Sequence, residues 1–151
     1  MRSSPAVVNG MLYVGSTDHK LYALNASTGQ LEWAFSTGGS LYSSPTVVSG
    51  VLYFGSDDHN VYALDAVTGS KKWAFSTGGP VQSSPAVVNK VLYVGSFDVK
   101  VYALDASTGQ LNWTFPTGGP VQSSPTVINR VLYFGSDDHK VYHLMLPALS
   151  P

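Results

Sequence analysis

The stretch ALDASTGQLNW occupies residues 103–113, and two close copies of it lie earlier in the chain. ALNASTGQLEW spans 23–33 and ALDAVTGSKKW spans 63–73, so the copies recur every 40 residues. A fixed period of this length is typical of solenoids, propellers and other repeat arrays. The same register divides the 151 residues into a single domain of four repeats, at 3–42, 43–82, 83–122 and 123–151, of which the last is incomplete.

Each repeat predicts four short strands. It opens with Ser-Ser-Pro, and the residue before a proline favours an extended backbone. β-branched and aromatic runs then predict strands at 6–8, 20–24 and 31–35 in the first repeat and at 51–54 in the second. Leu31, Trp33 and Phe35 alternate along one strand, so we expect all three on one face. No segment has a helical period, which indicates an all-β chain.

The turn between the first two strands differs among the repeats. Asn9-Gly10 is a strong signal for a tight β-hairpin, and Ser49-Gly50 takes the same place in the second repeat. Lys90 and Arg130 replace the glycine in the later repeats. Because residues with a Cβ atom are poorer at positive φ, we expect a different turn type there.

The middle strands are apolar on both faces. Leu52 and Phe54 point to one side of their strand, and Val51 and Tyr53 point to the other. A small sheet of this kind must be covered by other sheets on both sides, as blades stacked around an axis are. We therefore expect a β-propeller of four-stranded blades. A β-helix is the structural alternative, but its coils rarely need four hairpin-connected strands.

The motif A-x-D/N-x-x-T-G-x-x-x-W, preceded by L-Y-x-G-S-x-D, resembles the repeat of PQQ-like, or quinoprotein-type, β-propellers. The match covers nearly the whole chain and recurs three times in register. The resemblance implies that each Trp lies flat against the adjacent blade, with small residues leaving room for the ring. It also suggests a bacterial extracytoplasmic location. The implied inter-blade residues are Trp33, Trp73, Trp113, Ala23, Ala63, Ala103, Gly29, Gly69 and Gly109.

Repeats one and three match each other more closely than they match repeats two and four. After Ser-Ser-Pro the residues alternate as Ala6, Thr46, Ala86, Thr126, and the second strands alternate as Val14, Phe54, Val94, Phe134. We interpret this as large-against-small packing between neighbouring blades. Such an alternation closes without a mismatch only in a ring with an even number of blades. Duplication of a two-blade unit is an alternative explanation of equal weight.

The fourth repeat ends without the Thr-Gly turn and the Trp, so we expect its blade to lack the outer strand. Pro147 and Pro151 are suited to protecting that open edge. Four blades either close alone or supply half of a larger ring. We expect two chains to join head to tail, blade four against blade one, into one eight-bladed homodimer. A four-bladed monomer is the alternative.

Two sets of polar residues are candidates for binding or chemistry. Asp18-His19, Asp58-His59 and Asp138-His139 suggest metal or acid–base chemistry, but they lie on different blades, and we expect turns in which Asp bonds its own backbone. Residues at the loop into each innermost strand are candidates for a ligand or protein site at the axial mouth, although capping of the inner strands is the simpler role. They are Tyr42, Gln82, Gln122, Ser43, Ser83 and Ser123.

Composition narrows the function. The net charge of -1 argues against nucleic-acid and membrane-surface partners, and the absence of cysteine excludes thiolate chemistry. Met1-Arg2 runs directly into a strand, so we expect no signal peptide in this chain.

We expect a non-catalytic scaffold, interaction or sensor module without a cofactor or metal. A quinoprotein dehydrogenase would need unlike residues converging on its quinone, whereas here nearly every polar residue is repeated and the only glutamate is Glu32. An engineered or truncated propeller fragment is a further alternative.

Overall fold

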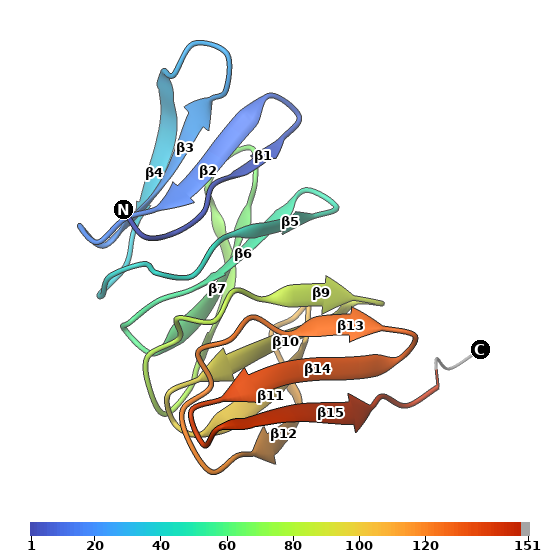
Figure 1. Ribbon diagram of the computed structural model, residues 1–151. Helices are drawn as coiled ribbons and strands as arrows, with labels where there is room; N and C mark the ends of the chain where they lie inside the picture. Colours follow the sequence, from blue (N-terminus) through green and yellow to red (C-terminus); the bar gives the residue numbers. More distant parts are fainter. Residues whose placement is uncertain (149–151) are drawn as a thin grey trace.

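The computed structural model describes residues 1–148, which form four antiparallel sheets. We number these sheets as blades 1 to 4 in chain order (Figure 1). Blade 1 holds β1 (Ala6–Val8), β2 (Met11–Gly15), β3 (Lys20–Asn25) and β4 (Leu31–Ser36). Blade 2 holds β5 (Thr46–Val48), β6 (Val51–Gly55), β7 (Asn60–Asp65) and β8 (Lys71–Ser76). Blade 3 holds β9 (Ala86–Val88), β10 (Val91–Ser96), β11 (Lys100–Asp105) and β12 (Leu111–Pro116). Blade 4 holds β13 (Thr126–Ile128), β14 (Val131–Ser136) and β15 (Lys140–Met145).

The expected all-β propeller fold is confirmed by these sheets, in each of which consecutive strands are neighbours. Blade 4 has no outer strand within residues 1–148, as its missing turn and Trp predicted. Pro147 lies two residues after the end of β15, and Pro151 lies outside the described residues.

The turn into each outer strand is set by one side chain. The Oδ1 atom of Asn25 accepts hydrogen bonds from the backbone N–H groups of Ser27 and Thr28, both at 3.0 Å. Asp65 and Asp105 do the same in blades 2 and 3. This Asx-type turn explains why Asp or Asn recurs at the end of the third strand.

The alternation of Leu31, Trp33 and Phe35 was interpreted wrongly, because the outer strand contains a bulge. The register shifts between Ala23 and Leu24, so that Ala23 pairs with Trp33 but Leu24 pairs with Leu31. Directly paired residues share a face of a sheet. Leu31 therefore lies on the face opposite to Trp33 and is 58% exposed.

The expected difference in turn type at Lys90 and Arg130 is also wrong. Lys90 has a φ of 65° and Arg130 a φ of 64°, close to the 77° of Gly10 and Gly50 at the same place. The hairpins thus keep one geometry in all four blades. The paired strands fix the turn, and the two long side chains adopt a backbone conformation that glycine adopts more readily.

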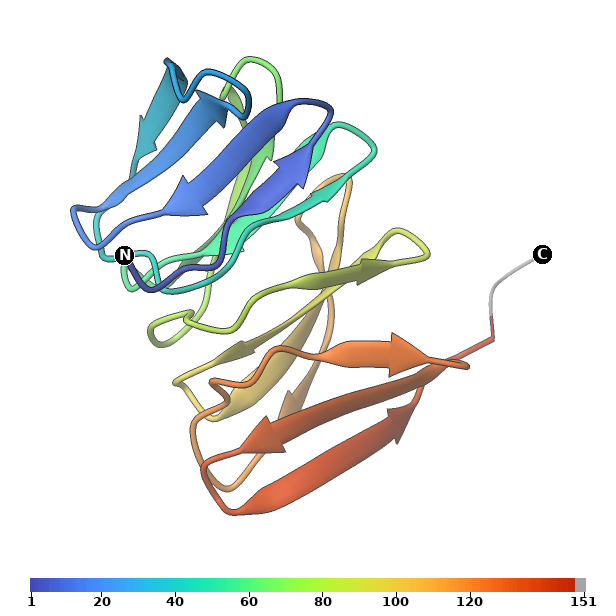
Figure 2. The ribbon, with the colours of Figure 1, turned by 45° about the horizontal axis from the view of Figure 1, so that its top comes forward.

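The blades form an open arc. β1 lies against β5, β5 against β9 and β9 against β13, so the short first strands line the inside. Within residues 1–148, no strand of blade 1 contacts a strand of blade 4, and the two lie at opposite ends of the arc (Figure 2). The single chain therefore does not close into a four-bladed ring.

The core consists of three separate layers, one between each pair of adjacent blades. Between blades 1 and 2, Tyr13, Leu21 and Ala23 pack against Leu52 and Phe54. We call the side of a blade that faces the next blade its forward face, and the other side its back face. Equivalent residues fill the layers between blades 2 and 3 and between blades 3 and 4.

Replacing Lys90 or Arg130 by glycine is expected to stabilise the protein. Glycine removes the cost of a Cβ atom at positive φ, about 1 kcal/mol, although it adds freedom to the unfolded chain. We expect a net gain of about 0.5 kcal/mol in the free energy of unfolding by denaturant titration. Gly10→Lys and Gly50→Lys, the matched reverse changes, should be destabilising. Equal stability of all four variants would contradict the prediction.

Candidate functional site: blade faces and inter-blade grooves

The structure places two of the repeated tryptophans against glycines of the next blade. A methyl group added to Gly69 would lie 2.6 Å from Cε3 of Trp33, and one added to Gly109 would lie 2.6 Å from Cδ2 of Trp73. Both glycines have positive φ. The indole thus lies directly on a turn that only glycine fits, both for its conformation and for its lack of a side chain.

Within residues 1–148, the third tryptophan and the first glycine lack these partners. Trp113 packs at the edge of a cluster that contains Leu146, where blades 2 and 3 have Ala66 and Ala106. A methyl group on Gly29 would have no atom within 4 Å. The two residues therefore mark the two ends of the arc.

The repeated alanines lie under the indoles. Ala23, Ala63 and Ala103 are fully buried. Each pairs directly with the Trp of its own outer strand. A larger side chain here would push the ring away from the next blade.

Hydroxyl and indole groups also link the blades. The Tyr13 hydroxyl donates to the carbonyl oxygen of Ala66 at 2.8 Å, and the Tyr53 hydroxyl to that of Ala106 at 3.1 Å. The Trp73 indole N–H donates to the same Ala106 oxygen at 3.0 Å. Burial raises the pKa of Tyr53, with a smaller contribution from the charge of Asp105. The tyrosines thus remain neutral donors at neutral pH.

Two of the serines expected at the axial mouth lie inside the protein instead. Ser43 and Ser83 are fully buried, and each accepts a hydrogen bond at 3.0 Å from a strand amide, that of Gly55 or Gly95. Ser123 accepts from the Gly135 amide at 2.8 Å but is partly exposed, because no blade follows. Ser43 and Ser83 thus have the capping role that was the alternative to an open mouth, since they hold the inner strand to the second strand.

The other mouth candidates are more accessible. Gln82 donates to Asp57 at 3.0 Å, and Gln122 donates to Asp137 at 2.6 Å. The ring of Tyr42 lies below the guanidinium of Arg2, 5.8 Å from its centre. Each of these groups pairs with a nearby side chain.

A second series of serines was missed by the sequence analysis. The Ser4 amide donates to the Ser44 hydroxyl at 2.9 Å, the Ser44 amide to Ser84 at 2.8 Å, and the Ser84 amide to Ser124 at 3.1 Å. We call this series the serine ladder. It links each blade to the next along the inside of the arc. The signal was present in the sequence as the second serine of every Ser-Ser-Pro, 40 residues apart.

The aspartates of the Asp-His pairs act as structural ties. In blade 2, Asp58 Oδ1 accepts from the Asn60 amide at 3.1 Å, while Oδ2 accepts from the Tyr62 hydroxyl at 2.6 Å and the Gly38 amide at 2.9 Å. Gly38 belongs to the linker from the blade before. The carboxylate therefore holds its own turn and joins it to the preceding blade.

The histidines of these pairs occupy the turn itself. His19, His59 and His139 have φ values of 71°, 74° and 68°, and Val99 takes the same conformation at 63°.

Within residues 1–148, no three His, Asp or Glu side chains are grouped so that they could hold a metal ion. In that part of the chain, no helix is long and apolar enough to cross a membrane.

Hydrogen bonding lowers the pKa of the aspartates that form these structural ties. Burial by itself raises the pKa of Asp58, but the hydrogen bonds from Tyr62, Gly38 and Asn60 outweigh it and lower the pKa below its ordinary value. For the half-buried Asp138, the hydrogen bond from Tyr142 is the main cause of a lowered pKa.

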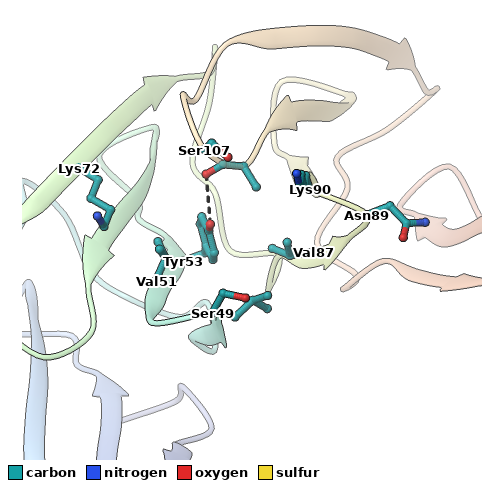
Figure 3. A pocket seen from close by; sticks show the side chains of 10 residues that line it. Ser49, Val51, Tyr53, Lys72, Val87, Asn89, Lys90 and Ser107 are labelled. Carbon is teal, nitrogen blue, oxygen red and sulfur yellow. Dashed lines mark hydrogen bonds between the residues drawn. The ribbon is translucent and has the colours of Figure 1, made fainter. Parts of the chain in front are cut away.

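Three grooves lie between adjacent blades, on the hairpin side rather than the Asp-His side. Their volumes are 260 Å³ between blades 1 and 2, 390 Å³ between blades 2 and 3, and 340 Å³ between blades 3 and 4. Tyr53 forms the floor of the middle groove, and Lys72 and Lys90 lie on either side of it (Figure 3). No sequence motif marked these grooves.

The two end faces of the arc expose residues that are buried elsewhere. On the forward face of blade 4, Tyr133 is 42% and Val141 81% exposed, whereas their equivalents Tyr53 and Val61 are 4% and 0% exposed. On the back face of blade 1, Val7 is 61% exposed. Its equivalents pack into the layers between blades. Both faces thus carry residues typical of a blade interface with no blade opposite.

Comparison with known proteins identifies the repeat. The model of the family described as outer membrane protein assembly factor BamB matches residues 1–84 and 76–145. The chain belongs to this family. The resemblance to PQQ-like propellers is thereby confirmed. A search of curated proteins gives no significant match.

Solved structures share the fold at low sequence identity. BamB from Moraxella catarrhalis is 21% identical, with a TM-score of 0.85 over 96% of this chain and 46% of that chain. The chain thus spans about half of that protein's length. The computationally designed Ika4 protein is 16% identical, with a TM-score of 0.85 over 97% of this chain and 94% of that one. The designed Ika8 protein is 16% identical, with a TM-score of 0.84 over 94% and 45%. The four blades therefore form a half-propeller.

Gly109→Ala is expected to destabilise the protein more than Gly29→Ala. The two glycines have nearly the same φ, 75° and 73°, but only Gly109 lies under an indole. Both variants carry the cost of alanine at positive φ, about 1 kcal/mol, and Gly109→Ala adds about 1–3 kcal/mol for displacing Trp73. Denaturant titration measures the difference. Equal losses would contradict the packing described here.

Removing the Tyr62 hydroxyl is expected to raise the pKa of Asp58 and to weaken the acid sensitivity of the protein. The folded-state pKa of Asp58 lies below its unfolded value, so its contribution is present at neutral pH and is lost as pH falls below about 4. In Tyr62→Phe, the free energy of unfolding should therefore fall less between neutral and acid pH. Carboxyl NMR titration and denaturant unfolding between about pH 6 and pH 2 measure both quantities. An unchanged pKa of Asp58 would contradict the hydrogen bond from Tyr62 described here.

Proposed function

We propose that this chain is a non-catalytic half-propeller that associates head to tail with a second copy, giving an eight-bladed ring that serves as a scaffold for protein interactions. In this ring the forward face of blade 4 of each copy packs on the back face of blade 1 of the other. The interface is heterologous but closes after two copies, because each copy spans half of the circle.

The observation that carries this proposal is that the contacts between blades stop at both ends of the arc. The serine ladder runs from Ser4 to Ser124 and ends with the Ser4 hydroxyl on one side and the Ser124 amide on the other. Tyr133 likewise has no next blade to receive its hydroxyl, which in Tyr13 and Tyr53 donates to an alanine carbonyl. A second copy would supply the Ser4 hydroxyl and the Ala26 carbonyl.

The alternation between odd and even blades also supports this arrangement. The forward face of blade 2 packs on the back face of blade 3. In the even-numbered blade 2, the large Phe54 faces blade 1. In the odd-numbered blade 3, the smaller Val94 at the same place faces blade 2. Blade 4 resembles blade 2, and blade 1 resembles blade 3. The contact of blade 4 with blade 1 of a second copy would repeat the contact between blades 2 and 3 without a change of size.

The lengths of the similar structures agree with half of a ring. The same four blades correspond to 94% of the Ika4 chain but to 45% of the Ika8 chain and 46% of BamB. Four blades therefore occur both as a nearly whole chain and as somewhat less than half of a longer one. In the longer chains a second half of similar size is covalently attached. We infer that a second copy takes its place here.

Near-symmetry favours a scaffold over an enzyme. Catalysis needs unlike groups placed asymmetrically around one reacting atom. Here the aspartate before each third strand accepts a hydrogen bond from a Tyr of its own blade, and in blades 2, 3 and 4 it also accepts one from a glycine amide of the preceding linker. These aspartates are Asp18, Asp58, Asp98 and Asp138. The polar groups thus serve the backbone. A repeated surface of inter-blade grooves, by contrast, suits recognition of a partner protein across several blades.

Wild-type protein is expected to have the mass of two chains in solution, and Val141→Arg the mass of one. Val141 is 81% exposed on the proposed interface, where an arginine would be buried without a partner. Val67→Arg is the matched control, because Val67 is 78% exposed in a turn away from that face and should leave the dimer intact. Light scattering coupled to size-exclusion chromatography measures the mass. A wild-type monomer would overturn the proposed ring.

A further inference from the structure

Blade 4 has a vacant position where the other blades have their outer strand. β4, β8 and β12 pair with the third strand of blades 1, 2 and 3. In blade 4, β15 pairs with β14 on one side and, within residues 1–148, with nothing on the other. In Figure 1, β15 lies at the end of the arc with its outer edge uncovered.

The backbone of this edge is set to receive a strand. In blades 1 to 3, the carbonyls of His19, His59 and Val99 accept from the amides of Thr37, Thr77 and Thr117 at the end of the outer strand, each at 2.8 Å. His139 takes the same place before β15. Because donors and acceptors alternate along a strand, Val141 and His143 present their backbone groups to the same side. Their equivalents in blade 1, Leu21 and Ala23, pair with Phe35 and Trp33.

The edge also lacks the features that normally prevent strand addition. Proteins protect exposed edges with prolines, charged side chains or bulges. Between Val141 and Met145 there is no proline and no side chain of Lys, Arg, Asp or Glu. β15 pairs with β14 in regular register over its whole length. Pro147 lies beyond the strand, so it leaves Val141 and His143 free to pair.

An apolar hollow lies beside this edge. It has a volume of 270 Å³ and is lined by Trp113, Phe115, Leu144, Met145 and Pro147. Trp113 and Phe115 come from blade 3, so the hollow separates its outer strand from β15. The equivalent Trp33 and Trp73 each lie on the glycine turn of the complete blade that follows. An added strand would fill the hollow.

We propose that the free edge of β15 binds an extended segment of a partner polypeptide by antiparallel strand addition. The other blades define the chemistry of that segment. It alternates Trp and Phe on one side with small or polar residues on the other, as in LEWAFS of β4. Backbone hydrogen bonds supply the pairing, and the aromatic residues lie over His143 and Val141.

The residue opposite the added Trp is His143, where blades 1 to 3 have the small alanine that leaves room for the ring. The contact between an indole and a glycine turn of the next blade is therefore not part of this proposal. The pairing with β15 does not depend on the proposed ring, because the edge and the hollow belong to one chain.

The probe is a fluorescein-labelled peptide with the sequence of residues 28–37, TGQLEWAFST. We expect saturable binding of one peptide per chain by fluorescence anisotropy. In the register of blade 1, the amides of its Trp and Phe face the third strand, and those of its Ala and Ser face away. N-methylation of the Trp and Phe amides should weaken binding at least about tenfold. N-methylation of the Ala and Ser amides, the matched control, should change it less than about twofold.

Hydrogen exchange locates the peptide without any change to the protein. The amides of Val141 and His143 should gain protection when the peptide binds, while those of Tyr142 and Leu144, which face β14, should not. Failure to bind, equal weakening by both methylations, or protection elsewhere would overturn the proposal.

A variant that leaves β15 untouched separates this proposal from that of the ring. Val7→Arg places a charge on the back face of blade 1, and we expect it to give a monomer that still binds the peptide. Binding to a monomeric wild type would disprove the ring alone. A dimer that does not bind the peptide would disprove strand addition alone.

Discussion

The structure depends on the burial of both faces of each blade by its neighbours. A blade of this chain is only a few residues wide and apolar on each side, so it has no core of its own. Its stability comes from the layers that it shares with the blades before and after it, as in other repeat proteins. The indole on its glycine turn is the most demanding contact in that layer, because it requires both a special backbone and an empty space.

Polar residues serve the same arrangement. The buried serines, the serine ladder and the aspartate ties all bond to backbone groups between or within blades. Such bonds satisfy N–H groups that lie in irregular linkers near the inside of the arc, where a missing partner would be costly. This explains why so few charged residues suffice and why most of the polar ones recur in every repeat.

The repeat period of the sequence predicted the positions of the strands well. The errors concerned a bulge, a turn conformation and the burial of a serine, none of which can be recognised from a repeated pattern of residue types. The first strand was predicted at 6–8 and is β1, and the other strands differ by one residue at an end. The alternation of Leu31 with Trp33 was misread because a bulge cannot be recognised from alternation alone. Lys90 was expected to change its turn, but the flanking strands determine the hairpin. Ser43 looked accessible because burial depends on blade spacing, which no local pattern reports.

The repeats are nearly equivalent in sequence but not in their surroundings, and the possible sites of function follow from this difference. Tyr53 and Tyr133 are equivalent residues, yet one is 4% and the other 42% exposed, because within residues 1–148 Tyr133 has neither the Trp of an outer strand nor a next blade beside it. Residues that are merely structural in the middle of the arc therefore become surface at its ends. A protein built in this way needs no specialised motif to bind another chain. Within residues 1–148, the outer edge of β15 and the end faces of blades 1 and 4 are uncovered, and their chemistry suits segments that continue the repeated pattern.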